Sequence, residues 1–218
     1  PQYVFLYDLL KRSESHVVSL SDRIKKEFIA RGIDSTNVSV LPCGIDTDLY
    51  TLDETDVLYP DRSIVVGKIE PRKRQAFLQH KDLNIDFIGN NTDSSFDELD
   101  PHYLGEQSKQ DIMDNLTAYA SMVLLSSGEA HPFVCLEGMA AGLGLVLSEQ
   151  STANLDISQP FITVIPDDKL DDTTYLDQKI KENRKISLTM RNDIRKYCFD
   201  NFDWSSIIKQ YKSIIDSI

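Results

Sequence analysis

Two carboxylates stand in a stretch that is otherwise nearly free of charge, SSGEAHPFVCLEGMAAGLG at residues 126–144. From residue 132 to residue 147 every position except Glu137 is apolar or Gly. Such a segment predicts a helix buried on all sides, where an ionised carboxylate is costly unless a partner pairs with it. That partner is either a Lys or Arg of a neighbouring element or a ligand, and the spacing alone does not choose between them.

Glu129 lies just after a predicted strand at residues 121–125, in the loop before this helix. Pro132 suits the first helical position, so Glu137 falls about a turn and a half inside the helix. Both carboxylates can therefore face one crevice. A buried carboxylate accepts two charge-assisted hydrogen bonds, which is a natural way to hold the two hydroxyls of a ribose.

The amino end of the same helix offers a second kind of contact. The backbone N–H groups of Phe133 and Val134 have no acceptor within a helix, and we expect them to point into the crevice. Together with the positive end of the helix dipole, they favour an anion. His131 is a candidate general base, but a lone loop histidine more often has no chemical role.

A basic cluster, GKIEPRKR at residues 67–74, follows another predicted strand and brings four cations into an acidic chain. Gly67 permits close approach of the backbone, and the cluster suits a diphosphate. The alternative is a surface turn in which Lys68 and Arg72 pair with acids. A further strand end, LPCGID at residues 41–46, offers Gly44 as a position of close approach, although such turns are common.

Other chemistries find no support in the sequence. No G-x-S-x-G, G-x-x-x-x-G-K-[ST] or G-x-G-x-x-G is present, and no His or carboxylate cluster has metal-ligand spacing. A formal net charge of −12 over 218 residues argues against nucleic-acid binding. Three Cys without close spacing favour a reducing compartment. Because no apolar run approaches about 20 residues and no signal pattern is visible, we expect a cytoplasmic protein.

The elements that must carry these residues alternate along the chain. Strands are predicted at residues 16–20, 38–41, 63–68, 84–88, 121–125, 145–148 and 161–165, and helices at 23–30, 73–80, 109–119, from 132, 188–200 and 205–217. This alternation predicts an α/β fold, a Rossmann-like doubly wound parallel sheet with helices on both faces. We expect one domain over residues 1–218, a surface connection at 53–61, and an amphipathic lead-in at 1–12.

Taken in order, these stretches resemble the C-terminal, donor-binding half of retaining glycosyltransferases of the GT-B fold, in the E-x7-E family (glycosyltransferase family 4, glycosyl transferases group 1). The likeness is carried by VVSLSDRIKKEFIARGI, VSVLPCGIDTDLY, VVGKIEPRKRQAFL, FDWSSIIKQY and the pair Glu129 and Glu137. Lys68 stands where the family usually has Arg, which keeps the charge but loses the fork-shaped donor. Cys43, Gly138 and Gly144 are further departures, at packing positions.

The resemblance implies a role for each candidate residue. Lys68 and Lys73 would hold the diphosphate of a nucleotide-sugar donor, while Glu137 binds the ribose hydroxyls and Glu129 lies near the transferred sugar. Gly67, Gly44, Pro132, Phe133 and Val134 would border the donor. The implied reaction is sugar transfer with retained anomeric configuration and without a metal or another cofactor, as in polysaccharide or glycoconjugate synthesis.

The resemblance also implies a missing half. The family has a second, N-terminal domain that recognises the acceptor, which is a sugar, a lipid or a protein. The lead-in at 1–12 and the closing helix at 201–218 would contact that domain, which could also attach the protein to a membrane surface. Alone, this chain would transfer little or no sugar. Two alternatives stay open: a non-catalytic nucleotide-sugar binding module, and a nucleotide-sugar epimerase of the same fold.

Overall fold

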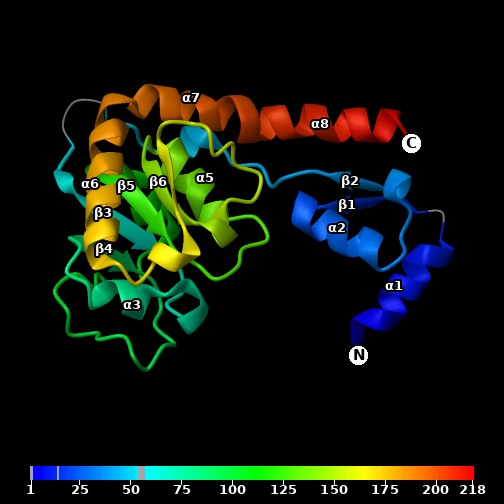
Figure 1. Cartoon of the computed structure of the whole chain (residues 1–218). Helices are drawn as coiled ribbons and strands as arrows, with labels where there is room; N and C mark the ends of the chain where they lie inside the picture. Colours follow the sequence, from blue (N-terminus) through cyan, green and yellow to red (C-terminus); the bar gives the residue numbers. More distant parts are fainter. Residues whose placement is uncertain (1, 14, 54–56) are drawn as a thin grey trace.

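A parallel sheet forms the centre of the computed structural model, which describes residues 2–13, 15–53 and 57–218 (Figure 1). Its strands are β3 (Tyr59–Val66), β4 (Ile85–Ile88), β5 (Tyr119–Leu124), β6 (Gly144–Ser148) and β7 (Ile162–Ile165). They lie in the order β4-β3-β5-β6-β7, and every neighbouring pair is parallel. Parallel strands need crossover connections, and these bring helices onto the faces of the sheet.

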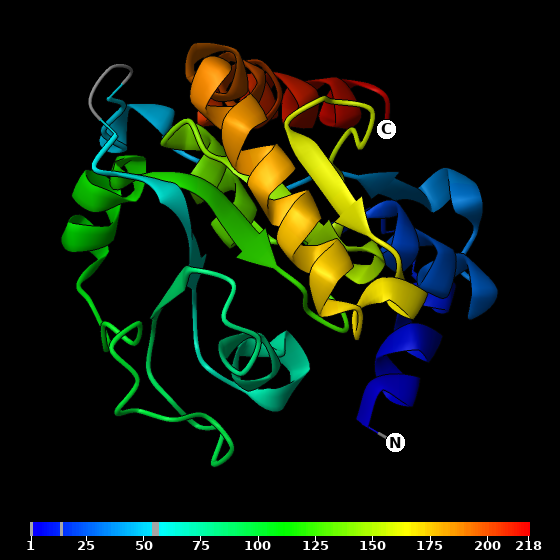
Figure 2. The same cartoon turned by 60° about the vertical axis from the view of Figure 1, so that its left-hand side comes forward.

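Alternate residues of the central strands face two separate apolar cores. In β3, Ile64 and Val66 pack into the core shared with helices α5 (Phe133–Ala140) and α7 (Arg191–Phe202). Val65 faces the opposite core, shared with α3 (Gln75–Gln79) and α6 (Thr173–Thr189). Figure 2 shows α6 lying across one face of the sheet. The predicted doubly wound α/β fold with helices on both faces is therefore confirmed.

The order of the strands reverses between β3 and β5. The chain runs outward from β3 to β4 and then returns to the other side of β3 as β5. At such a switch point ligands typically bind in a crevice beyond the carboxyl ends of the strands. The sequence stretches 67–74 and 126–137 follow β3 and β5 closely, so both lie where this crevice is expected.

A second, smaller group of elements precedes the main sheet. Strands β1 (Val17–Ser19) and β2 (Val38–Val40) pair in parallel, with helix α2 (Asp22–Ala30) between them in sequence. Helix α1 (Gln2–Arg12) packs on α2, and Figure 1 shows the group beside the larger sheet. These two predicted strands pair only with each other and do not join the five-stranded sheet. The single domain over residues 1–218 stays a prediction.

Helix α6 was not expected from the sequence. Its buried positions are Leu176, Ile180, Asn183, Arg184 and Ser187, so the face toward the sheet is largely polar. The three polar residues hydrogen-bond to groups at the sheet: Asn183 donates to Leu145 O, and Ser187 Oγ accepts from Gly144 N. A helix with a polar inward face gives no apolar periodicity to read.

The remaining bounds differ from the predicted ones by a few residues. Helix α4 covers Lys109–Asn115 and α8 covers Trp204–Asp216. The expected surface connection at 53–61 is partly wrong, since β3 already begins at Tyr59, and residues 54–56 lie outside the described residues. In the part of the chain that the structure describes, no helix combines the length and the apolar character needed to cross a bilayer.

Candidate functional site

Two loops meet at the carboxyl ends of β3 and β5. The Ser127 N–H donates to Arg72 O at 2.8 Å, and the Arg72 guanidinium reaches Glu129 Oε1 at 3.0 Å and Ser126 Oγ at 3.0 Å. Arg72 also donates to Gly128 O. The structure thus brings the predicted basic cluster and the predicted carboxylate loop together, which the sequence separates by more than 50 residues.

The basic loop places Lys73 over a glycine. Gly67 has φ +133, and a Cβ added there would come within 2.8 Å of Lys73 Nζ. Within the described residues neither Lys68 nor Lys73 has an ion-pair partner, although the chain is strongly acidic. Unpaired ammonium groups at the end of a central strand are available to an anion.

Lys68 and Gly67 border an open cavity of about 420 Å³ beside the crevice. Its full lining is Val66, Gly67, Lys68, Ile88, Gly89, Asn90, Glu106, Gln107 and Ile112. Its lining combines apolar side chains, backbone and side-chain amides, the Lys68 ammonium and the Glu106 carboxylate. That mixture suits a flat, polar-edged ligand group better than a purely apolar one.

The buried thiol of Cys135 is subject to the electrostatic influence of several predicted site residues. Cys135 is fully buried in α5. Burial raises the pKa of its thiol, the carboxylates of Glu129 and Glu137 raise it further, and the Lys73 ammonium lowers it. One side chain therefore feels three of the predicted site residues at once, even though they come from two separate stretches of sequence.

Glu137 finds two partners that the sequence did not reveal. The Tyr50 hydroxyl donates to Glu137 Oε1 at 3.1 Å, and the Lys109 ammonium donates to the same oxygen. Lys109 Nζ also lies 2.8 Å from Tyr50 Oη. Burial, followed by the nearby carboxylate of Glu137, raises the pKa of the Tyr50 phenol, so this hydroxyl keeps its proton.

The question that the sequence left open has a concrete answer in this structure. A Lys of a neighbouring element pairs with Glu137, yet it is not a core cation: its side chain is 50% exposed, against 9% for the carboxylate. Lys109 is the first residue of α4, and no apolar pattern or motif marks it. Tyr50 ends the stretch GIDTDLY, which is part of a segment that carries the resemblance, but the resemblance implies no role for this Tyr.

Glu129 is held from two sides. Its carboxylate, 15% exposed, pairs with Arg72, which also binds Glu70 at 2.8 Å. Its backbone oxygen accepts from Arg23 Nη2 of α2 at 2.8 Å. Burial alone would lower the pKa of the Arg72 guanidinium, but its bonds to Glu129 and Glu70 raise it. For Arg72 the predicted alternative, pairing with acids, is therefore confirmed, while for Lys68 it finds no support.

Helix α5 begins one residue later than predicted. Pro132 is its N-cap, and the helix starts at Phe133. In the described chain the N–H groups of Phe133 and Val134 have no hydrogen-bond acceptor, and the first capping bond comes from Cys135 N to Pro132 O at 2.9 Å. These free donors lie at the crevice, where an anion would complete them.

Gly44 and His131 have structural explanations. A Cβ on Gly44 would come within 2.5 Å of the Trp204 ring, so this glycine allows close packing against the start of α8. His131 is buried against the Phe202 ring and shares a 2.9 Å hydrogen bond with Asn154. Burial lowers the pKa of His131, although contacts with backbone groups oppose the shift. A buried neutral imidazole fits the interpretation that this histidine has no chemical role.

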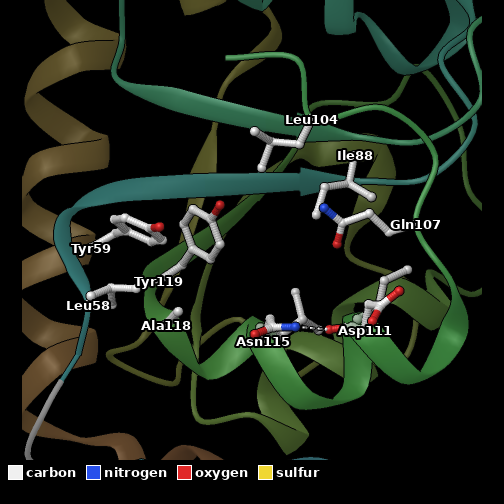
Figure 3. Close-up of a pocket in the computed structure, with 11 residues that line it drawn as sticks. Leu58, Tyr59, Ile88, Leu104, Gln107, Asp111, Asn115, Ala118 and Tyr119 are labelled. Carbon is white, nitrogen blue, oxygen red and sulfur yellow. Dashed lines mark hydrogen bonds between the residues drawn. The ribbon is translucent and has the colours of Figure 1, made fainter. Parts of the chain in front are cut away.

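A second pocket of about 190 Å³ lies next to the first cavity and shares Ile88, Gln107 and Ile112 with it. Figure 3 shows the Tyr59 and Tyr119 rings on one side and α4 on the other, where Asn115 Nδ2 donates to Asp111 O at 2.8 Å. None of the predicted site residues lines it. Most of its wall is apolar, and it holds no cation.

Several solved structures are similar to this chain over almost its whole length. HepE from Anabaena, crystallised with UDP-glucose, has a TM-score of 0.78 at 17% identity, over 100% of this chain and 68% of that one. The lipopolysaccharide outer core galactosyltransferase WaaB has a TM-score of 0.73 at 16% identity, over 93% and 62%. Sucrose-phosphate synthase from Thermosynechococcus elongatus has a TM-score of 0.73 at 16% identity, over 99% and 61%.

These likenesses establish the fold. WaaB is a galactosyltransferase, and this chain has the architecture of one Rossmann-like half of a GT-B fold. No protein-family model and no curated protein matches the sequence. The chain spans about two thirds of the length of the solved chains to which it is similar.

Proposed function

We propose that this chain is the donor-binding part of a glycosyltransferase that moves a sugar from a nucleoside-diphosphate sugar to an acceptor, with retention of the anomeric configuration. The observation that carries the proposal is that the loops after β3 and β5 meet through Arg72, Ser127 and Glu129, next to the amino end of α5 and to two lysines without an ion-pair partner among the described residues. Structural neighbours crystallised with UDP or UDP-glucose support a nucleotide sugar as the ligand.

Each group has a part in this proposal. Lys68, Lys73 and the N–H groups of Phe133 and Val134 neutralise the diphosphate as the bond from the sugar to the phosphate oxygen breaks. Such preorganised charges act without reorganising during the reaction, and they need neither a metal nor another cofactor. Glu137 binds the ribose, and the cavity beside Lys68 takes the base. Glu129, oriented by Arg72, faces the transferred sugar.

The acceptor is proposed to bind elsewhere, on a second domain that this chain does not contain. Helix α8 leaves a row of large side chains on one face, each about half exposed: Trp204, Ile208, Tyr211 and Ile215. Phe5 and Leu9 of α1 are also exposed. Apolar residues at helical spacing indicate a face that packs against another surface. By itself the chain is expected to bind nucleotide and to transfer little sugar.

Calorimetric titration of the chain with UDP, GDP and ADP tests the proposal. One of the three should bind, and Lys73→Ala should weaken that binding about a hundredfold while the protein stays folded by circular dichroism. Binding of none of the three by folded wild-type chain would overturn the proposal. A catalytic test uses a longer form carrying both domains: transfer to an added acceptor separates a transferase from a binding module, and an epimerised donor in the absence of acceptor identifies an epimerase.

A further inference from the structure

Both side-chain hydrogen bonds to Glu137 end on the same oxygen. Tyr50 Oη and Lys109 Nζ each donate to Oε1. No described side chain donates to Oε2. A carboxylate has two oxygens and about four acceptor sites, so about half of its capacity is left without a donor from the described side chains. The arrangement fixes the carboxylate without filling it.

A capping box fixes the start of α4, of which Lys109 is the first residue. Ser108 and Asp111 form a capping box, with Asp111 N donating to Ser108 Oγ at 3.1 Å and Ser108 N donating to Asp111 Oδ2 at 3.3 Å. This fixes the start of α4 and hence the Cα of Lys109. The positive end of a helix dipole does not stabilise a cation, so the favourable interactions of Lys109 are those with residues outside α4.

The ammonium sits between two aromatic rings. Lys109 Nζ lies 5.4 Å from the centroid of the Tyr50 ring and 5.7 Å from that of Phe133, the first residue of α5. Cation–π contacts at such distances hold an ammonium in place while one side stays open to water. Elements α4 and α5 and the segment ending at Tyr50 thus meet at one charged group.

This ion pair differs from the other lysine–carboxylate pairs of the described chain. The pairs of Lys11, Lys179, Lys181 and Lys196 each join residues three or four apart on a single helix. Both partners of those pairs are largely exposed, and such pairs contribute little. The pair between Lys109 and Glu137 instead joins two elements, and its carboxylate is nine-tenths buried.

We propose that Lys109 and Tyr50 are positioning residues of the ribose site, which hold Glu137 by Oε1 so that Oε2 is presented to the nucleotide hydroxyls. This inference rests on the proposed function and deepens it. Without Lys109, the carboxylate keeps one tether, rotates about its side-chain bonds and binds water in the crevice. The nucleotide then loses mainly the contribution that its ribose hydroxyls make to binding.

The test compares two ligands that differ only at the ribose. UDP and 2′,3′-dideoxy-UDP are titrated into the wild-type chain, Lys109→Met and Tyr50→Phe; if GDP or ADP is the nucleotide that binds, its dideoxy form replaces that of UDP. Lys109→Met keeps a long, unbranched side chain and removes its charge. Lys196→Met, which removes a lysine from an exposed pair on α7, is the matched control.

We expect the wild type and Lys196→Met to prefer UDP over its dideoxy form. Lys109→Met should bind UDP about tenfold more weakly, the loss of roughly one charge-assisted hydrogen bond, while dideoxy-UDP changes by less than about twofold. Tyr50→Phe should show a smaller loss of the same kind, and it keeps the test decisive if Lys109→Met does not fold.

Three results would overturn the inference. Equal weakening of both ligands by Lys109→Met would mean that Lys109 acts on the diphosphate or on the fold rather than through Glu137. Unchanged or tighter UDP binding would mean that Lys109 obstructs the site or plays no part in it. Both of these leave the proposed function standing, whereas a wild-type chain that binds no nucleoside diphosphate overturns both proposals.

Discussion

The two ends of the five-stranded sheet both carry cations, which are buried at one end and accessible to solvent at the other. At the amino ends of the strands, Arg184 donates to Ser63 Oγ, Leu83 O and Asn84 O, and Arg191 donates to Thr117 O and Tyr119 O. At the carboxyl ends, Lys68 and Lys73 have no ion-pair partner among the described residues. The arginines complete the hydrogen bonding of backbone carbonyl groups, while we propose that the lysines bind the diphosphate of a ligand.

The two kinds of cation differ both in burial and in partners: the arginines are buried and hydrogen-bonded, whereas the lysines are more exposed and have no ion-pair partner among the described residues. Burial lowers the pKa of both arginines, although the carboxylates of Asp61 and Asp177 raise that of Arg184 and the carboxylate of Asp53 raises that of Arg191. An arginine that joins the ends of several strands contributes to stability through hydrogen bonds that no other residue type can make together. The lysines at the other end contribute little to folding, so their variants should affect binding alone.

The largest effect is expected at the amino end. Arg191→Met removes four hydrogen bonds, including one to Thr117 Oγ1 and one to Ala141 O, and leaves buried carbonyl groups without a donor. The free energy of unfolding should fall by about 3 kcal/mol or more, as measured by urea denaturation. Folded variant protein should bind nucleotide as the wild type does. A variant as stable as the wild type would contradict the structural role.

Lys73→Met should give the reverse result. We expect the affinity for UDP, or for whichever nucleoside diphosphate binds, to fall about a hundredfold, since a cation on a diphosphate makes charge-assisted contacts. The melting temperature should stay within about 2 °C of that of the wild type, because no ion pair or hydrogen bond of the fold is lost. A large drop in melting temperature with unchanged affinity would assign Lys73 to the structural class.

Arg72 tests the boundary between the two classes. It is 44% exposed, yet it joins the two site loops through Ser126, Gly128 and Glu129. Arg72→Gln should lower the free energy of unfolding by about 1 kcal/mol, the usual scale for a partly exposed hydrogen-bonded pair, and weaken UDP binding by about threefold. Thermal melts and calorimetry measure the two effects. If neither quantity changes, the loops are fixed without Arg72.

The smallest effect concerns pH. Burial lowers the pKa of His131, so the folded state prefers the neutral imidazole. Its contribution to stability is complete above the unfolded pKa of about 6.5 and is lost as the pH falls below that value. The melting temperature should therefore drop more between pH 7.5 and 5.5 for the wild type than for His131→Gln. Parallel curves for the two proteins would show that His131 does not titrate with unfolding.

Much of the fold could be predicted because the amino-acid composition of the central strands identifies them as buried strands. Continuous apolar runs such as residues 121–125 and 145–148 mark strands covered on both faces, and the polar stretches between them mark the turns. The features that could not be predicted depend on contacts between distant residues or on buried polar side chains. The separate pairing of β1 with β2 is a tertiary feature that local sequence does not encode. Helix α6 buries Asn183 and Arg184 on its inward face, and a polar inward face gives no apolar periodicity from which to predict a helix.

The candidate site divides in the same way. Glu137 was conspicuous because it interrupts an apolar helix, and the cations of residues 68–74 because they interrupt an acidic chain. Lys109 does not stand out in this way, because it lies in a polar stretch of the sequence. Only the tertiary structure brings it to Glu137. A partner 28 residues away on another element leaves no local trace in a single sequence.

A crystal structure of this chain with a bound nucleoside diphosphate tests the central claim most directly. We predict the diphosphate between Lys68, Lys73 and the first N–H groups of α5, with the ribose hydroxyls on Glu137 Oε2 and with Lys109 still on Oε1. A nucleotide bound away from the carboxyl ends of β3 and β5, or one whose ribose does not contact Glu137, would contradict the account.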